Sequence, residues 1–494
     1  MRSAPGYIVA GLSGLQNFVN HVDGTSVPIT SHGRSTGGLL TTSGTRRNKN
    51  RPVSQCPIRW ILHSLGAARP TALNRRETDM QRREFLGSLA AGGLAVSLNS
   101  AALAADAASA DAGAGTAASS PSYHHELSAA TRFFDGKQSW CHPRAGAIPP
   151  RAPGNDSDLP IVVMTLQRLD LSGSDVFGGL QQMRTDDLGK TWQPPAPIPG
   201  FELRTLPDGH EETVCDFTPQ WHAASGKLLG TGHTVVYRNR RIPKTRPRST
   251  AYSSYDPATS RWSAWRALEM PDAKRFHDAG AGSTQRLDLP NGDILLPVYF
   301  RDNLKSATSK STVVRCRFDG ETLRYIEHGT ELSLDIPRGF GEPSIARVGD
   351  RFYLTLRNDK DGYVAASNDG LHYDTPRPWQ WDDGSSLGNY NTQQHWVTHG
   401  GNLYLVYTRR GADNDHVFRH RAPLFMAQVD QKTLRVVRET EQALMPNRGA
   451  RLGNFGVTEV SPKETWVTSA EWMQPKGCEK YGADGSVWVS RIRW

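Results

Sequence analysis

Short β-rich runs recur along most of this chain, and their spacing constrains the fold more than any other feature. Four of them cover residues 160–166, 292–300, 351–357 and 402–407, and turns rich in Gly, Asp and Asn precede them. The runs recur roughly every 50 to 60 residues, and helical periodicity is nearly absent after residue 140. This pattern predicts an all-β fold, a β-propeller in which each repeat forms one four-stranded antiparallel blade.

The number of strand groups predicts the number of blades. The groups fall near residues 158–200, 212–268, 278–333, 341–382, 393–444 and 452–494. Residues 126–150 precede the first group, and we expect them to complete the ring. The sequence therefore predicts a six-bladed β-propeller, because a seventh blade would need residues that the chain does not have.

The N-terminal region differs from this body in composition and charge. The formal net charge is +9, and residues 1–83 alone hold twelve Lys and Arg against three Asp and Glu. The rest of the chain is therefore neutral, which argues against a nucleic-acid-binding body. No apolar run of 18 or more uncharged residues follows residue 105, so we expect no membrane span.

An export signal explains part of the basic region. The segment Met80-Gln81-Arg82-Arg83-Glu84-Phe85-Leu86 precedes a weakly apolar stretch and Ala102-Leu103-Ala104, which resembles a twin-arginine (Tat) signal with its cleavage site. We expect residues 1–79 to be disordered or an over-extended start, 80–105 the signal peptide, 106–125 a linker and 126–494 the propeller. The predicted location is periplasmic or secreted.

One turn carries a recognisable motif. Residues Thr185-Asp186-Asp187-Leu188-Gly189-Lys190-Thr191-Trp192 match the pattern Ser/Thr-x-Asp-x-Gly-x-Thr-Trp, the Asp-box or bacterial neuraminidase (BNR) repeat, and residues 367–373 form a degenerate copy. The Asp187 carboxylate can accept hydrogen bonds from its own turn, while Gly189 permits a positive φ. We therefore expect this motif to be structural.

Six blades, Asp-boxes and an export signal together resemble the sialidase (neuraminidase) superfamily, and the resemblance covers residues 138–494. It implies an exo-α-sialidase-like glycoside hydrolase, active in carbohydrate metabolism on the acidic, carboxylated end of a glycan. The segment Gly341-Glu342-Pro343-Ser344 and Arg357, about 15 residues later, look like the family's modulating glutamate and one arginine of its carboxylate-binding triad.

The same resemblance implies further site residues. Arg144 matches the first triad arginine, Arg419 or Arg421 the third, and Asp170 or Asp175 the acid/base aspartate. These two pairs of alternatives stay open. The family's tyrosine nucleophile has no counterpart, because the corresponding stretch, residues 453–460, holds no tyrosine.

Other aromatic and polar residues are candidates for sugar binding, since flat rings contact pyranoses and amides bind hydroxyl groups. We expect Tyr299, Asn389, Tyr390, Gln394 and His395 to bind substrate, with His233 as a further cleft residue. Histidine and tyrosine also suit an alternative function, a lyase or other glycosidase for an acidic polysaccharide. A third possibility is a non-catalytic carbohydrate-binding propeller.

The sequence calls for no cofactor. Cys141, Cys215, Cys316 and Cys478 lack CxxC and zinc-ligand spacings, and no carboxylate cluster requires a metal. We expect a monomer whose partner is a glycan or acidic polysaccharide.

Overall fold

The computed structural model describes residues 123–494 except 174, 244–246 and 304–305. All of these belong to one compact unit, residues 110–494. The predicted disordered start, the signal peptide and most of the linker lie outside the described residues. No helix in the described part of the chain is long and apolar enough to cross a lipid bilayer.

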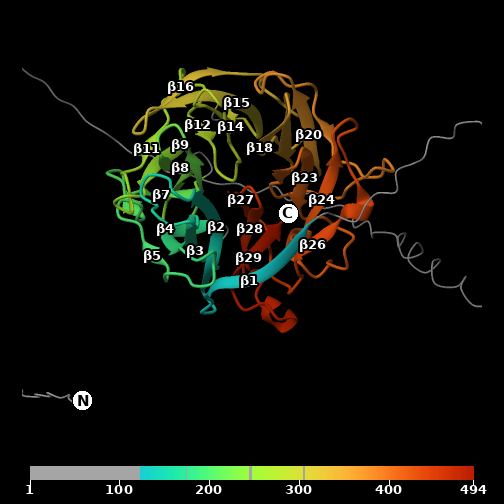
Figure 1. Ribbon diagram of the computed structural model, residues 1–494, viewed down its shortest axis with the longest axis horizontal. Coiled ribbons are helices and arrows are strands. Elements are labelled where there is room, and N and C mark those ends of the chain that lie inside the picture. The colour runs from blue at the N-terminus through green and yellow to red at the C-terminus, as the bar shows by residue number, and fades with distance from the viewer. Residues whose placement is uncertain (1–122, 174, 244–246, 304–305) are drawn as a thin grey trace, which may run out of the picture. The chain divides into compact units, whose positions relative to one another are not determined.

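Six β-sheets surround a common axis, and their main strands pair antiparallel with their neighbours in sequence (Figure 1). This confirms the predicted six-bladed propeller of four-stranded antiparallel blades. Blade one contains β2 (Gln138–Ile148), β3 (Ile161–Asp170), β4 (Val176–Thr185) and β5 (Ala196–Pro197). Blade two contains β6 (Arg204–Thr205), β7 (Glu211–His222), β8 (Lys227–Tyr237), β9 (Thr250–Asp256), β10 (Arg261–Trp262) and β11 (Arg266–Ala267). Blade three contains β12 (Asp278–Gly280), β13 (Leu287–Asp288), β14 (Asp293–Arg301), β15 (Thr308–Phe318), β16 (Leu323–His328) and β17 (Arg338–Gly339).

The last three blades complete the ring, and the described helices are three short 3-10 turns. Blade four contains β18 (Gly341–Val348), β19 (Arg351–Arg357), β20 (Gly362–Ser367) and β21 (Arg377–Pro378). Blade five contains β22 (His395–His399), β23 (Asn402–Tyr407), η1 (Phe418–His420), β24 (Leu424–Asp430), β25 (Arg435–Val436), η2 (Arg438–Thr440) and β26 (Gln442–Met445). Blade six contains β27 (Gly456–Ser461), β28 (Glu464–Ala470), η3 (Cys478–Tyr481), β29 (Ser486–Arg493) and β1 (His124–Arg132).

The two ends of the described chain close the ring. Strand β1 pairs with β29 from His124 opposite Arg493 to Arg132 opposite Ser486. The N-terminal strand thus completes the sixth blade, as expected for residues 126–150. Residues 138–148, in contrast, form β2, the innermost strand of blade one, so the first blade begins about 20 residues before the predicted boundary of 158.

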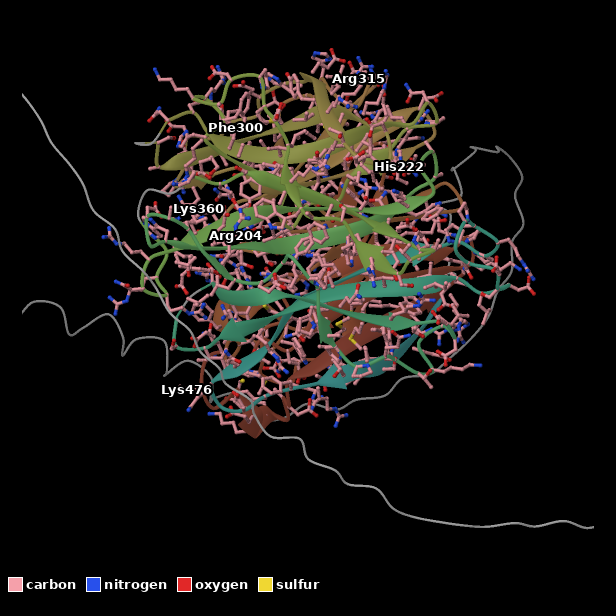
Figure 2. The ribbon with its side chains drawn as sticks, turned by 90° about the vertical axis from the view of Figure 1, so that its left-hand side faces the viewer. Arg204, His222, Phe300, Arg315, Lys360 and Lys476 are labelled. Atoms are coloured by element: carbon pink, nitrogen blue, oxygen red, sulfur yellow. The ribbon has the colours of Figure 1, made fainter. Side chains whose placement is uncertain are left out.

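Burial on both faces explains why the blade strands are so apolar. Eight of the nine residues of β14 are buried, because neighbouring blades cover both faces of each sheet. Between blades four and five, for example, Trp379, Trp396 and Tyr407 share one apolar cluster. In side view, charged residues such as Arg315 and Lys476 lie at the periphery of the propeller (Figure 2).

Six polar residues, one per blade, have a left-handed backbone within or close to the innermost strand. We call them the inner ring, and their φ values lie between 46° and 63°: His142, Asp216, Ser283, Glu342, Asn391 and Asn454. In β2, β7 and β18 the residue lies at a register shift of the strand pairing. A bulge of this kind redirects a side chain, and here each blade directs one polar group toward its neighbours around the axis.

Candidate functional site

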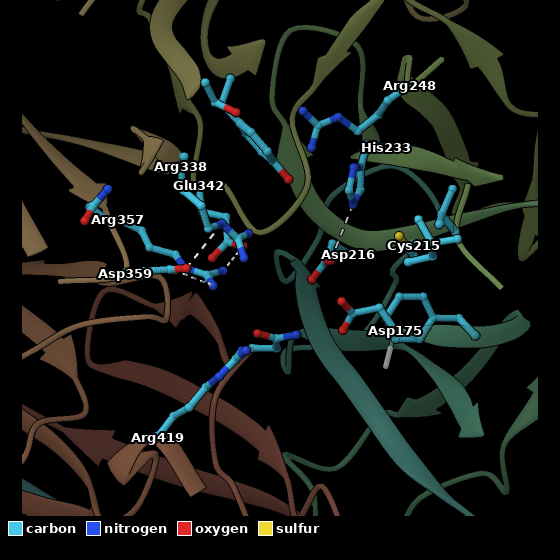
Figure 3. Close-up of a pocket in the computed structure, with 18 of the residues that line it drawn as sticks. Asp175, Cys215, Asp216, His233, Arg248, Arg338, Glu342, Arg357, Asp359 and Arg419 are labelled. Carbon is cyan, nitrogen blue, oxygen red and sulfur yellow. Dashed lines mark hydrogen bonds and ion pairs between the residues drawn. The ribbon is translucent and has the colours of Figure 1, made fainter. Parts of the chain in front are cut away.

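Three residues of the inner ring, Asp216, Glu342 and Asn454, line a pocket of about 220 Å³ to which all six blades contribute. Figure 3 shows this pocket. A cavity of this size suits one sugar residue rather than a long chain segment. Its charged lining residues are Asp175, Asp216, Arg248, Glu342, Arg338, Arg357, Asp359, Arg419, Arg421 and Arg451, with His233 and Tyr299 beside them.

Glu342 and Arg357 meet in this pocket, as the sequence predicts. Gly341 pairs with Arg357 across the hairpin of β18 and β19, and a bulge follows at Glu342. The Arg357 guanidinium donates to a Glu342 carboxylate oxygen and, over 3.0 Å, to Asn391 Oδ1. Burial opposes the charge of Arg357, but Glu342 and Asp359 raise its pKa. Arg357 is therefore charged and held rigidly.

Arg419, Arg421 and Arg451 form what we call the arginine cluster. None of the three forms an ion pair with any carboxylate in the part of the chain that the structure describes. The guanidinium of Arg451 lies 4.1 Å from the ring centre of Trp472, and Arg421 donates to the backbone oxygen of Asn391. Among the described residues the cluster thus has no carboxylate at ion-pair distance, although Asp175, Glu342 and Asp359 line the same pocket.

Burial makes this charge costly. Arg421 is only 3% exposed, and burial together with Arg357, Arg451 and Arg419 lowers its pKa well below the usual range. Burial and Arg419 lower the pKa of Arg451 to about 10. An anionic ligand would relieve this repulsion, because a carboxylate can pair with several guanidinium groups at once. Both sequence alternatives, Arg419 and Arg421, line the pocket.

Asp216 lies across the cavity from Arg419 and is held by several donors (Figure 3). Its Oδ1 accepts from Arg144 over 2.9 Å and from Ser283 Oγ over 2.5 Å, and its Oδ2 lies 3.5 Å from His233 Nε2. Burial alone would raise the pKa of Asp216, but His142, His233 and Arg144 hold it well below the usual value. Asp216 is therefore an ionised carboxylate.

Of the two rival aspartates, the structure brings Asp175 to the pocket. Asp175 has a φ of 59° just before β4 and lines the cavity. Asp170 lies at the end of β3, where it accepts from the Ser172 backbone over 3.0 Å and lies 3.9 Å from Arg240. It borders a separate surface depression.

Arg144 lies behind the pocket and does not line it. Its guanidinium is fully buried and donates to the Phe455 carbonyl over 2.7 Å, besides its bonds to Asp216 and Ser283. It therefore fixes Asp216 from below and ties blade one to blades two, three and six.

The predicted sugar-binding segment of blade five also lies outside the pocket. Gln394 accepts a hydrogen bond from Thr355 Oγ1 and donates one to the Thr392 carbonyl, and His395 bonds to Ser344 Oγ over 2.8 Å. Asn389 is buried beneath Gly362, and Tyr390 bonds to His420 over 2.5 Å. Gln394 and His395 thus connect blade five to blade four, and none of these four residues lines the cavity.

Tyr299 does line the pocket, next to His233 and Arg248. The Arg248 guanidinium lies 4.1 Å from the Tyr299 ring centre and pairs with Asp278 over 2.7 Å. Burial raises the pKa of the Tyr299 phenol, so the hydroxyl stays protonated. The His233 ring packs directly against the backbone of Gly282. Only glycine fits there, because a Cβ at this position would come within 2.3 Å of the ring.

Cys215, Asp216 and His233 each offer one potential metal-ligand atom, all within 4.8 Å of one another. Asp216 already accepts from the buried Arg144, and Arg248 lies beside the Tyr299 ring in the same wall. A further cation here would meet two guanidinium groups, so the trio is better explained as a hydrogen-bonded carboxylate and imidazole.

Sequence reasoning missed Asp216, Arg248, Arg338 and Arg451 as pocket residues. One signal was present: Asp216-Phe217-Thr218 parallels Glu342-Pro343-Ser344, an acidic residue two positions before a hydroxyl residue. Both acidic residues belong to the inner ring.

Solved structures resemble this fold at low sequence identity. A protein of unknown function from Dyadobacter fermentans aligns over 76% of this chain and 99% of its own, with a TM-score of 0.50 and 13% identity. The NanB sialidase from Streptococcus pneumoniae aligns over 74% of this chain and 70% of its own, with a TM-score of 0.50 and 10% identity. No protein-family model and no curated protein matches the sequence. The likeness establishes a sialidase-like propeller fold, and chemistry must come from the site.

Proposed function

We propose that this protein is an exported glycoside hydrolase that removes a carboxylated sugar from the end of a glycan. The observation that carries the proposal is the arginine cluster, whose buried positive charge has no carboxylate partner among the described residues. A substrate carboxylate would supply that partner, with Arg357 beside it. The small cavity favours a terminal sugar over an internal one.

The carboxylates of the pocket supply the chemistry for cleavage. Glycoside hydrolysis needs one carboxylic acid to protonate the leaving oxygen and a second group to stabilise or attack the anomeric carbon. Asp175 is our candidate acid, and Glu342, paired with Arg357, modulates the site. Export rests on the twin-arginine pattern of the sequence.

Product analysis on a panel of acidic glycans tests this function, with variants of the Glu342–Arg357 pair. Arg357→Lys keeps the charge but loses the planar fork, so affinity for the carboxylated sugar should fall by roughly 1.5–3 kcal/mol. Glu342→Gln should leave binding within a few-fold and reduce turnover by roughly 10²-fold. Release of no saturated acidic monosaccharide from any glycan would refute the proposal.

A second candidate function, a polysaccharide lyase, is favoured by one observation. His233 and Tyr299 line the same pocket with ring centres 6.2 Å apart, and Arg248 adjoins them. Such a set can remove the proton next to a uronate carboxylate and protonate the leaving oxygen. An unsaturated, ultraviolet-absorbing product would identify the lyase, and binding without any product would identify a carbohydrate-binding propeller.

A further inference from the structure

We propose that Asp216 is the catalytic nucleophile of this pocket and that the substrate is therefore a uronic acid glycoside. The inference rests on the proposed glycoside hydrolase function and names its substrate class. Three features carry it: the position of Asp216 in the inner ring, its hydrogen bonds, and its place across the cavity from Arg419.

The two carboxylate oxygens of Asp216 are held unequally. Arg144 and Ser283 both donate to Oδ1, whereas the contact of Oδ2 is the longer one to His233 at 3.5 Å. The side chain is 13% exposed, and it lines the pocket. Asp216 is thus an ionised carboxylate in the pocket wall, whose Oδ1 is fixed by two close donors and whose Oδ2 has only the longer contact to His233. Fixed orientation is what a nucleophile requires.

The charge of the nucleophile limits the substrate. When a carboxylate is attached to the anomeric carbon itself, a neutral phenol can approach that carbon without repulsion, but an ionised Asp216 cannot. In a uronic acid the carboxylate is attached to the carbon on the other side of the ring oxygen. An anionic nucleophile can then reach the anomeric carbon while arginines hold the substrate carboxylate.

The pocket has its candidate nucleophile on one wall and a carboxylate-binding arginine on another. Arg419 lies on one side of the cavity and Asp216 on the other (Figure 3). No tyrosine from blade six lines the described pocket; that blade contributes Arg451, Asn454 and Trp472. Binding of the carboxylate and attack on the anomeric carbon therefore fall to different walls, as a uronide requires.

The reaction proceeds in two displacements. Asp216 Oδ2 bonds to the anomeric carbon as the glycosidic C–O bond breaks, and Asp175 gives its proton to the leaving oxygen. Water then attacks the anomeric carbon, passes a proton to Asp175, and releases the free uronic acid and the Asp216 carboxylate.

Covalent trapping of the full-length, unaltered protein tests the assignment directly. The protein is incubated with a fluorinated glucuronosyl fluoride of each anomer, then digested and analysed by mass spectrometry. We expect the glycosyl ester on the peptide that contains Asp216. Labelling of another residue, or of none while the protein cleaves methylumbelliferyl glucuronide, would overturn the role of Asp216.

Variants provide a second measurement. Asp216→Asn retains an acceptor for Arg144 and should fold, while turnover of methylumbelliferyl glucuronide falls by roughly 10³-fold or more. Azide should restore cleavage by Asp216→Gly and give a glycosyl azide, which a structural role would not produce. Asp293→Asn is the matched control, because Asp293 is a buried carboxylate that pairs with Arg317 away from the pocket.

The outcomes separate this inference from the function on which it rests. Cleavage of a methylumbelliferyl sialoside but not of the glucuronides would support the hydrolase and overturn the uronide assignment. An unsaturated product would overturn both the hydrolase and the nucleophile. Activity that is lost in EDTA and restored by Zn²⁺ would assign Cys215, Asp216 and His233 to a metal instead.

Discussion

At the scale of single residues, the pocket contains a buried positive charge, that of Arg421, which destabilises the ligand-free protein. Arg421 is buried beside Arg357, Arg419 and Arg451, and all of them carry the same charge. A buried cation without a carboxylate partner destabilises a protein unless a ligand neutralises it. The cost in stability is therefore best explained by ligand binding.

Replacing this charge should separate stability from binding. We predict that Arg421→Met raises the melting temperature of the ligand-free protein, because it removes repulsion from three neighbouring guanidinium groups. The same variant should bind D-glucuronate at least about tenfold more weakly, the effect of one lost charged hydrogen bond. Thermal melts and calorimetry measure the two effects. A lower melting temperature together with unchanged binding would show that Arg421 is structural.

The buried His395 predicts how the stability of the folded protein depends on pH. Burial, and next Arg144, lower its pKa from 6.5 to about 3, so the imidazole is neutral in the folded protein at neutral pH. The unfolded chain takes up the proton more readily, and stability should therefore fall as pH drops from about 6.5 toward 3, by up to about 1.4 kcal/mol per pH unit.

His395→Gln should reduce this slope, although it also costs stability at neutral pH through the contact with Ser344. Denaturant unfolding at several pH values measures the slope. His142 adds to the wild-type slope in the same direction, because burial lowers its pKa as well. Equal slopes in the variant and the wild type would contradict the assignment.

Only part of the site could be predicted residue by residue. Glu342 and Arg357 could be, because one hairpin brings them together and their separation is visible in the sequence. The burial of Arg144 could not, since its partners Asp216, His395 and Phe455 lie 72, 251 and 311 residues away. Only closure of the ring brings these groups together.

At the scale of elements, the turn after β4 links two blades. Asp187 accepts from Thr185 Oγ1, the Thr191 backbone and Thr191 Oγ1 over 2.7–2.9 Å. Beneath the turn, the ring of Trp192 lies 6.0 Å from that of Trp466 in blade six. These hydrogen bonds of Asp187 stay within its own turn, as the structural role expected from the sequence requires.

We predict that Asp187→Ala lowers the melting temperature and leaves kcat of the folded fraction unchanged. The alanine removes the acceptor of the Thr191 backbone N–H, and the turn loosens above Trp466. Asp186→Ala is the control, since the neighbouring Asp186 is half exposed and pairs with Arg184. Loss of turnover at a normal melting temperature would instead make Asp187 a catalytic residue.

Repetition of the blades explains how the fold could be predicted when much of the site could not. Strand runs such as β14 and β23 are apolar because every blade is covered on both faces, and this requirement repeats six times. The inner ring also repeats, with a left-handed residue in each blade. Its members differ in chemistry, and the repeat does not reveal which of them face the ligand.

At the scale of the whole molecule, the propeller depends on contacts between the ends of the described chain. Strand β1 covers the edge of β29, and Tyr123 just before it packs against Tyr404 and Trp494, with ring centres 5.9 and 5.5 Å apart. The N-terminal strand thus joins blades five and six. Without it, β29 would present an unpaired edge.

Two truncated chains test this closure. We predict that a chain beginning at residue 122 folds with one cooperative thermal transition, because it retains β1 and all six blades. A chain beginning at residue 138 lacks β1 but keeps the rest of every blade, so it should melt at a lower temperature and aggregate through the exposed edge of β29.

A synthetic peptide of residues 123–133 should restore part of the lost stability by pairing with that edge. The same peptide with a proline at position 127, where Leu127 pairs with Ser490, should not. Equal melting temperatures for the two chains would mean that the ring is closed by contacts between the blades and not by β1.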